Sequence, residues 1–148
     1  MQKSVLFICT GNTCRSPMAH AYVADRFRRM GRSDLEALSA GVAAWSNSPA
    51  SEQSISVMSE IGIDLRGFRS TRLTEHLADS VDRIVCMTAG HLQAVLAMGV
   101  PPEKLTLLAD PQDVPDPFGG DVEVYRRVFS FMKPALDNLT DQLLGEAR

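Results

Sequence analysis

Long hydrophobic runs and a surplus of positive charge are both missing from this sequence. The early apolar run, residues 5–9, is far shorter than the roughly 20 residues that span a bilayer and too short for a signal-peptide core. Lysine and arginine number 15 and aspartate and glutamate 18, so the formal net charge is -3. We therefore expect a cytoplasmic protein with no general affinity for nucleic acid or membranes, which binds any anion at a local site.

Cysteine is scarce, and histidine lacks the paired spacing of metal ligands. Three cysteines, an odd number, do not indicate the framework of a small secreted disulfide protein. The histidines at 20, 76 and 91 are predicted at the surface or at helix caps, so neither a metal nor another cofactor is expected. The length of 148 residues, with 45% hydrophobic and 22% charged residues, predicts one domain over residues 1–148, assumed to be monomeric.

Short apolar segments alternate with helical patterns along the chain. Strands are predicted at residues 4–9, 35–39, 81–87 and 105–108, and helices at about 17–30, 49–61, 91–98 and from 122 onward. Ser16 is the expected N-cap of the first helix, and Pro134 is expected to kink the last one. The alternation predicts an α/β fold of three layers, with helices on both faces of a four-stranded parallel sheet in the flavodoxin-like order 2-1-3-4.

The loop after the first predicted strand carries reactive residues at a fixed spacing. Five residues separate Cys9 from Arg15, and Ser16 and a helix start follow at once. Backbone N–H groups of such a loop can cradle a tetrahedral dianion, and the arginine adds a planar, permanently charged fork. The same positive field favours the cysteine thiolate, the form that attacks. This pattern predicts covalent phosphoryl transfer to the sulfur of Cys9.

A proton donor for the leaving group is expected in the proline-rich turn at residues 110–120. Pro115 and Pro117 stiffen the backbone on either side of Asp116, and the turn follows the last predicted strand, so Asp116 is the preferred donor. Asp110 is the alternative carboxylate.

Two segments at opposite ends of the chain resemble the signature loop and the acid loop of the low-molecular-weight protein tyrosine phosphatase family. They are Cys-Thr-Gly-Asn-Thr-Cys-Arg-Ser-Pro at residues 9–17 and Asp-Pro-Phe at residues 116–118. The resemblance covers nearly the whole chain, because residues 39–41, residues 86–87 and the helix near Pro49 also match. It implies a phosphatase that hydrolyses phosphorylated protein substrates through a phosphocysteine intermediate, without a metal.

The resemblance also implies a role for each matched residue. Cys9 would be the nucleophile, Arg15 the phosphate clamp, and Asp116 first the acid and then the base. The phosphate-binding loop would comprise Thr10, Gly11, Asn12, Thr13, Cys14, Arg15 and Ser16. Asn12, supported by Ser39, would hold this loop in a strained shape, and Ser16 would stabilise the thiolate. His20 departs from the family, where glutamate is common, and this difference concerns only local helix capping.

The residues expected to form the substrate wall indicate two different substrates. Thr13 replaces the isoleucine of most phosphotyrosine enzymes, and threonine is typical of the protein-arginine phosphatase branch; its hydroxyl can pair with a guanidinium. Phe118 is followed by glycine instead of a second aromatic, which favours the same branch. Trp45 matches an aromatic of the ring-binding wall in phosphotyrosine enzymes. Phosphoarginine is thus slightly favoured, with phosphotyrosine as the alternative.

Other interpretations of the loop fit the sequence less well. Arsenate reductases have a similar loop but need two further cysteines, and only Cys86 lies beyond it. A nucleotide-binding P-loop needs a lysine that is not found near Gly11. A module that only binds phosphoproteins would require neither Cys9 nor Asp116. Cys14 is equally compatible with a redox partner for the nucleophile and with simple packing.

Overall fold

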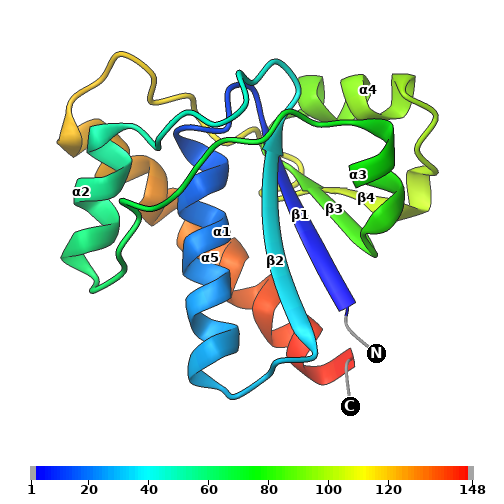
Figure 1. Ribbon diagram of the computed structural model, residues 1–148, viewed down its shortest axis with the longest axis horizontal. Helices are drawn as coiled ribbons and strands as arrows, with labels where there is room; N and C mark the ends of the chain where they lie inside the picture. The colour runs from blue at the N-terminus through cyan, green and yellow to red at the C-terminus, as the bar shows by residue number, and fades with distance from the viewer. Residues whose placement is uncertain (1–2, 147–148) are drawn as a thin grey trace.

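A four-stranded parallel sheet organises residues 3–146, the part of the chain that the computed structural model describes (Figure 1). Its strands are β1 (Lys3–Cys9), β2 (Leu35–Gly41), β3 (Arg83–Cys86) and β4 (Leu105–Leu107). They lie in the order β2-β1-β3-β4, and every neighbouring pair is parallel. The predicted α/β class and strand order are therefore confirmed.

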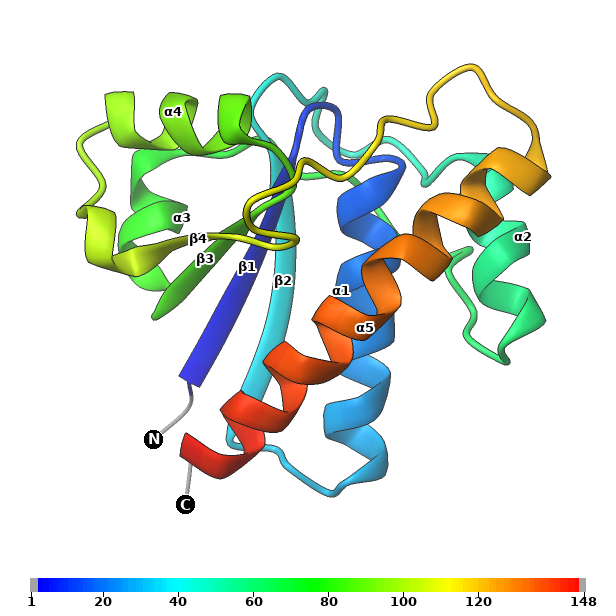
Figure 2. The same ribbon diagram turned by 180° about the vertical axis from the view of Figure 1, so that it is seen from behind.

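Helices cover both faces of this sheet (Figures 1 and 2). They are α1 (Arg15–Arg29), α2 (Glu52–Glu60), α3 (Glu75–Ser80), α4 (Ala89–Ala97) and α5 (Val122–Glu146), with a 3-10 turn at Pro102–Lys104. The α1, α2 and α5 helices share one hydrophobic core with the sheet, and α3 and α4 share a second. None of the helices within residues 3–146 is long and apolar enough to cross a membrane.

The central strand β1 shows why its sequence is apolar without a break. Side chains alternate between the two faces of a strand, so Val5 and Phe7 pack in the core with α1 and α5. Leu6 and Ile8 pack in the opposite core, under α3 and α4. Burial on both faces is typical of a parallel strand between helical layers, and it leaves Cys9 at the carboxyl end of the strand.

Two helix predictions need correction. Cys14 occupies the N-cap position of α1, which begins at Arg15, whereas Ser16 was the expected cap. The Ser16 hydroxyl is instead bonded within the loop, to Asn12 and Cys9. The positive end of the α1 dipole therefore lies in the loop itself. The α3 helix was not predicted, because its six residues bury only Ala78 and so provide no helical period.

The end of β2 packs tightly against the loop after β1. The backbone N–H of Gly41 donates to the carbonyl of Thr71, and its carbonyl accepts from Leu73. A Cβ at Gly41 would lie 2.5 Å from the carbonyl oxygen of Thr10 and 2.9 Å from the backbone nitrogen of Asn12. Only glycine leaves room for this approach of two backbones.

We therefore expect Gly41→Ala to displace the loop, since a rigid methyl group would overlap backbone atoms. Stability should fall by about 1 to 3 kcal/mol, measured by urea unfolding. Gly67→Ala is the matched control, because a Cβ there has no atom within 4 Å. Equal behaviour of the two variants would contradict this view of the β2 terminus.

Candidate active site

The loop between β1 and α1 lines a cavity of about 250 Å³ at the carboxyl ends of the strands. Its lining residues are Cys9, Thr10, Gly11, Thr13, Cys14, Arg15, Asp116 and Phe118. In Figure 2 the yellow segment that leads into α5 passes beside the blue loop that follows β1. The fold thus brings the two predicted motifs, about a hundred positions apart in the chain, to one cavity.

Cys9 and Ser16 form the buried base of this cavity. The Cys9 Sγ lies 2.8 Å from the Ser16 Oγ. The Asn12 side-chain amide donates to the same Oγ, also at 2.8 Å. Because the Ser16 oxygen accepts from the amide, its own proton is free to point at the sulfur. This arrangement can stabilise a thiolate at Cys9.

Asn12 holds the loop in a strained conformation. Its φ angle is 56°, in the left-handed region, and its side chain is fully buried. The side-chain oxygen accepts a 2.8 Å hydrogen bond from the backbone N–H of Thr71. The amide of Asn12 is thus bonded at both ends, to Ser16 and to Thr71.

The expected support of Asn12 by Ser39 is not found. The Ser39 hydroxyl is bonded to the Nδ1 of His20, 2.9 Å away, and the backbone of Thr71 takes the place at Asn12. The ring of His20 also packs edge-on against Phe68, at 5.9 Å between ring centres. His20 therefore does more than cap a helix, because it connects α1 to β2 and to the loop that carries Thr71.

Arg15 connects the loop to the second motif. The guanidinium is buried and donates a 3.0 Å hydrogen bond to the carbonyl of Val114. It also lies 3.8 Å from a carboxylate oxygen of Asp116, whose side chain is 57% exposed. The other Asp116 oxygen accepts from the backbone N–H of Phe118, which holds the turn. Asp110, the alternative carboxylate, does not line the cavity.

Cys14 has a partner that sequence patterns could not identify. Its Sγ lies 3.1 Å from the hydroxyl of Tyr125 on α5. Burial, and then the hydrogen bond to Cys14, raise the pKa of Tyr125 to about 12, so the phenol is neutral at physiological pH. Contact with α5 accounts for the packing of Cys14, and its redox role stays a prediction.

Thr10 has a side-chain partner on α4. Its Oγ1 lies 2.8 Å from the Nε2 of His91 on α4. His91 is only 6% exposed, contrary to the expected surface or capping position. Burial lowers the pKa of His91 to about 4, and the charge of Arg15 acts in the same direction. The ring is therefore neutral near pH 7.

The three residues expected in the substrate wall are not all at the cavity. Thr13 and Phe118 line it, and the side chain of Phe118 is 81% exposed. Trp45 does not line it; its side chain is 85% exposed, and its backbone carbonyl accepts from the Ser70 hydroxyl. A wall role for Trp45 stays a prediction that this cavity does not support.

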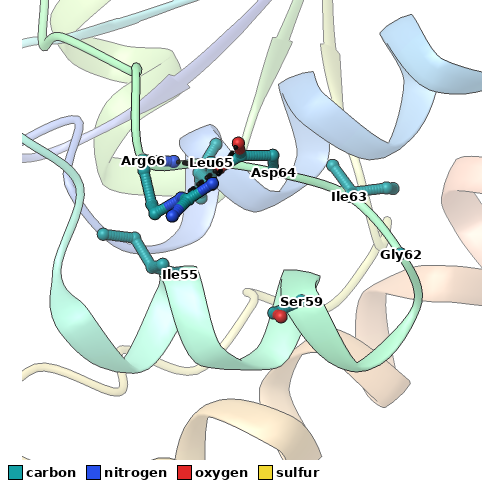
Figure 3. Close-up of a pocket in the computed structure, with 7 residues that line it drawn as sticks. All are labelled: Ile55, Ser59, Gly62, Ile63, Asp64, Leu65 and Arg66. Atoms are coloured by element: carbon teal, nitrogen blue, oxygen red, sulfur yellow. Dashed lines mark hydrogen bonds and ion pairs between the residues drawn. The ribbon is translucent and has the colours of Figure 1, made fainter.

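A second hollow of about 420 Å³ lies beside α2 (Figure 3). Ser59 is its one hydroxyl, and its two charged side chains, Asp64 and Arg66, bind each other at 2.9 Å. It contains no thiol and no unpaired charge, so it has no groups for phosphoryl transfer. Within residues 3–146, no three histidine, cysteine or acidic side chains are grouped so as to hold a metal ion.

Comparisons with known proteins agree on one family. The family model described as low molecular weight phosphotyrosine protein phosphatase matches residues 4–148. A protein-arginine-phosphatase of Geobacillus stearothermophilus is 34% identical, over 99% of this chain and 99% of its own. Low molecular weight protein-tyrosine phosphatase A of Mycobacterium tuberculosis is 34% identical, over 93% and 89%. The crystal structure of a low molecular weight protein tyrosine phosphatase from T. tengcongensis matches with a TM-score of 0.90 at 33% identity, over 95% and 99%.

One buried histidine, His91, and one half-buried histidine, His20, predict that the fold is sensitive to acid. Burial lowers the pKa of both His20 and His91 to about 4, whereas histidines of the unfolded chain titrate near 6.5. Between these pH values the unfolded chain binds protons that the folded protein does not. The free energy of unfolding should therefore fall as the pH drops from about 6.5 to about 4, on the order of 2 kcal/mol for each ring.

Urea unfolding at about pH 7 and about pH 4.5 measures this loss of stability. His20→Gln, which removes one ring of lowered pKa, should make the free energy of unfolding less dependent on pH. His76→Gln replaces an exposed ring on α3 and is the matched control, which should retain the wild-type dependence. An unchanged dependence in His20→Gln would show that burial of this ring is not the cause.

Proposed function

The chain belongs to the low molecular weight phosphotyrosine protein phosphatase family, and from this premise we propose that Cys9, Arg15 and Asp116 perform its hydrolysis. Family membership makes it a cysteine-dependent protein phosphatase, a hydrolase that acts on phosphorylated proteins. One observation carries the residue assignment. Cys9 and Asp116 line the same cavity, and Arg15 is bound to the turn that bears Asp116.

In the first step the Cys9 thiolate attacks the phosphorus of the bound phosphoryl group. An S–P bond forms, and the bond from phosphorus to the substrate oxygen or nitrogen breaks. Backbone N–H groups of residues 10–16 and the fork of Arg15 stabilise the phosphoryl oxygens. Asp116 gives its proton to the leaving group, for which its partial exposure at the cavity mouth is suitable.

In the second step a water molecule attacks the phosphocysteine. Asp116, now ionised, takes the proton of this water, and the S–P bond breaks to release inorganic phosphate. The departing sulfur becomes a thiolate again. The Ser16 hydroxyl, 2.8 Å away, supports this charge with a hydrogen bond.

Phosphoarginine is the favoured substrate in this proposal. The hydroxyl of Thr13 lines the cavity and can accept from a guanidinium N–H, which an aliphatic side chain cannot do. The absence of Trp45 from the lining removes the main feature that favoured a phenyl ring. The relative in Geobacillus stearothermophilus, a protein-arginine-phosphatase, supports this choice.

Phosphotyrosine is the second candidate, with the same mechanism. The exposed ring of Phe118 at the cavity could pack against a tyrosine ring. The equally similar relative in Mycobacterium tuberculosis is a protein-tyrosine phosphatase.

We further propose that residues 1–148 form one domain that acts as a cytoplasmic monomer.

The choice of acid predicts different effects for two aspartates. Asp116→Asn should slow phosphocysteine formation by about 10² to 10⁴ for substrates with poor leaving groups, and less for activated aryl phosphates, because only poor leaving groups need the proton. Single-turnover kinetics with both kinds of substrate measures this difference. Asp110→Asn is the matched control and should show no such dependence. If it shows the dependence and Asp116→Asn does not, the wrong carboxylate has been assigned.

The choice of substrate predicts a change of specificity at Thr13. Thr13→Ile removes a hydrogen-bond partner of the guanidinium and adds apolar surface for a phenyl ring. The ratio of kcat/KM for phosphoarginine over phosphotyrosine peptides should fall by one to two orders of magnitude, about 1 to 3 kcal/mol of differential binding. Cys9→Ala is the control without a nucleophile and should be inactive on both. Wild-type preference for phosphotyrosine, with a ratio that Thr13→Ile hardly changes, would refute the phosphoarginine proposal.

A further inference from the structure

The contact between Thr10 and His91 lies directly behind a lining residue of the cavity, and the proposed mechanism does not use it. Thr10 directly follows Cys9, is an exposed residue and lines the cavity. His91 lies on α4, and its Nε2 is 2.8 Å from the Oγ1 of Thr10. The other ring nitrogen, Nδ1, is buried and has no hydrogen-bond partner. The ring thus makes its one side-chain hydrogen bond to Thr10.

The Thr10 hydroxyl oxygen keeps at least one free lone pair, whichever ring nitrogen of His91 carries the proton. If His91 carries its proton on Nε2, the Oγ1 of Thr10 accepts and keeps a second lone pair. If the proton is on Nδ1, the hydroxyl donates to Nε2 and both lone pairs of Oγ1 stay free. In both cases the oxygen can accept a hydrogen bond from a substrate. Because the ring is held in the core, this acceptor is oriented before the substrate arrives.

We propose that His91 orients the Thr10 hydroxyl as a second acceptor for the N–H groups of a phosphorylated guanidinium. The inference rests on the proposed function, because it requires the phosphoryl group in the loop. A phosphoarginine side chain has several N–H donors next to its phosphorus, and the two residues with acceptor hydroxyls, Thr10 and Thr13, both line the same cavity. A phenyl ring has no such donors. Thr10 is therefore a specificity-determining residue, and His91 a positioning residue that acts through it.

The test compares four variants on phosphoarginine and phosphotyrosine peptides. Thr10→Val, which removes the hydroxyl at nearly equal volume, should lower the kcat/KM ratio of phosphoarginine over phosphotyrosine about tenfold. Thr10→Ser restores the hydroxyl and should recover most of the ratio. His91→Leu should lower the ratio in the same direction. The double variant Thr10→Val/His91→Leu should lose no more than Thr10→Val, because both changes remove one interaction.

A control variant and two possible results decide whether the inference holds. His76→Leu changes an exposed histidine on α3 and should leave both activities unchanged. Equal loss on the two substrates in Thr10→Val would mean that the hydroxyl only supports the loop, and the inference would be wrong. Additive effects of the two changes would separate His91 from Thr10 and would also overturn it. The wild-type ratio tests the phosphoarginine proposal, whereas the change of the ratio tests Thr10, so the two failures are distinguishable.

Discussion

The buried amide of Asn12 is the constraint on which the site depends. A residue other than glycine at a φ of 56° is strained, and this strain is held by hydrogen bonds at both ends of the side chain. One bond fixes Ser16, which in turn contacts the sulfur of Cys9; the other reaches the backbone of Thr71. Loss of this amide would release the loop and leave the Ser16 hydroxyl without the partner that orients it. The geometry around Cys9, the proposed nucleophile, thus depends on a segment some sixty positions away.

Arg15 has a second organising role besides its charge. Its guanidinium has several donors, and one is already bonded to the carbonyl of Val114. That bond fixes the start of the turn that presents Asp116, so the proposed phosphate clamp also sets the place of the proposed proton donor. The two motifs at opposite ends of the chain therefore meet through one side chain. A lysine could supply the charge but not this planar, multidentate arrangement.

The sequence predicted those features that depend on local patterns. The strand order followed from short apolar segments that alternate with helical periods, and the loop followed from the spacing of Cys9 and Arg15. The partners of the loop could not be predicted in this way. Thr71, Tyr125 and His91 come from three different segments, and only the packing of α4, α5 and the loop after α2 brings them into contact with the loop after β1. The expected support of Asn12 by Ser39 was wrong for the same reason, because the Ser39 hydroxyl is hydrogen-bonded to His20 on α1.

Four loop residues proposed for phosphoryl transfer are buried, whereas those proposed to select the substrate are more exposed. Cys9, Asn12, Arg15 and Ser16 are buried, and their polar atoms are tied into hydrogen bonds, so a substitution there would disturb several partners at once. Thr10 and Phe118 are exposed at the cavity, and Thr13 is half-buried. A change at these outer residues alters what the cavity can bind without breaking the inner hydrogen bonds. Under the proposed mechanism, one fold can therefore keep the inner residues for phosphoryl transfer while the proposed outer wall selects a guanidinium or a phenyl ring.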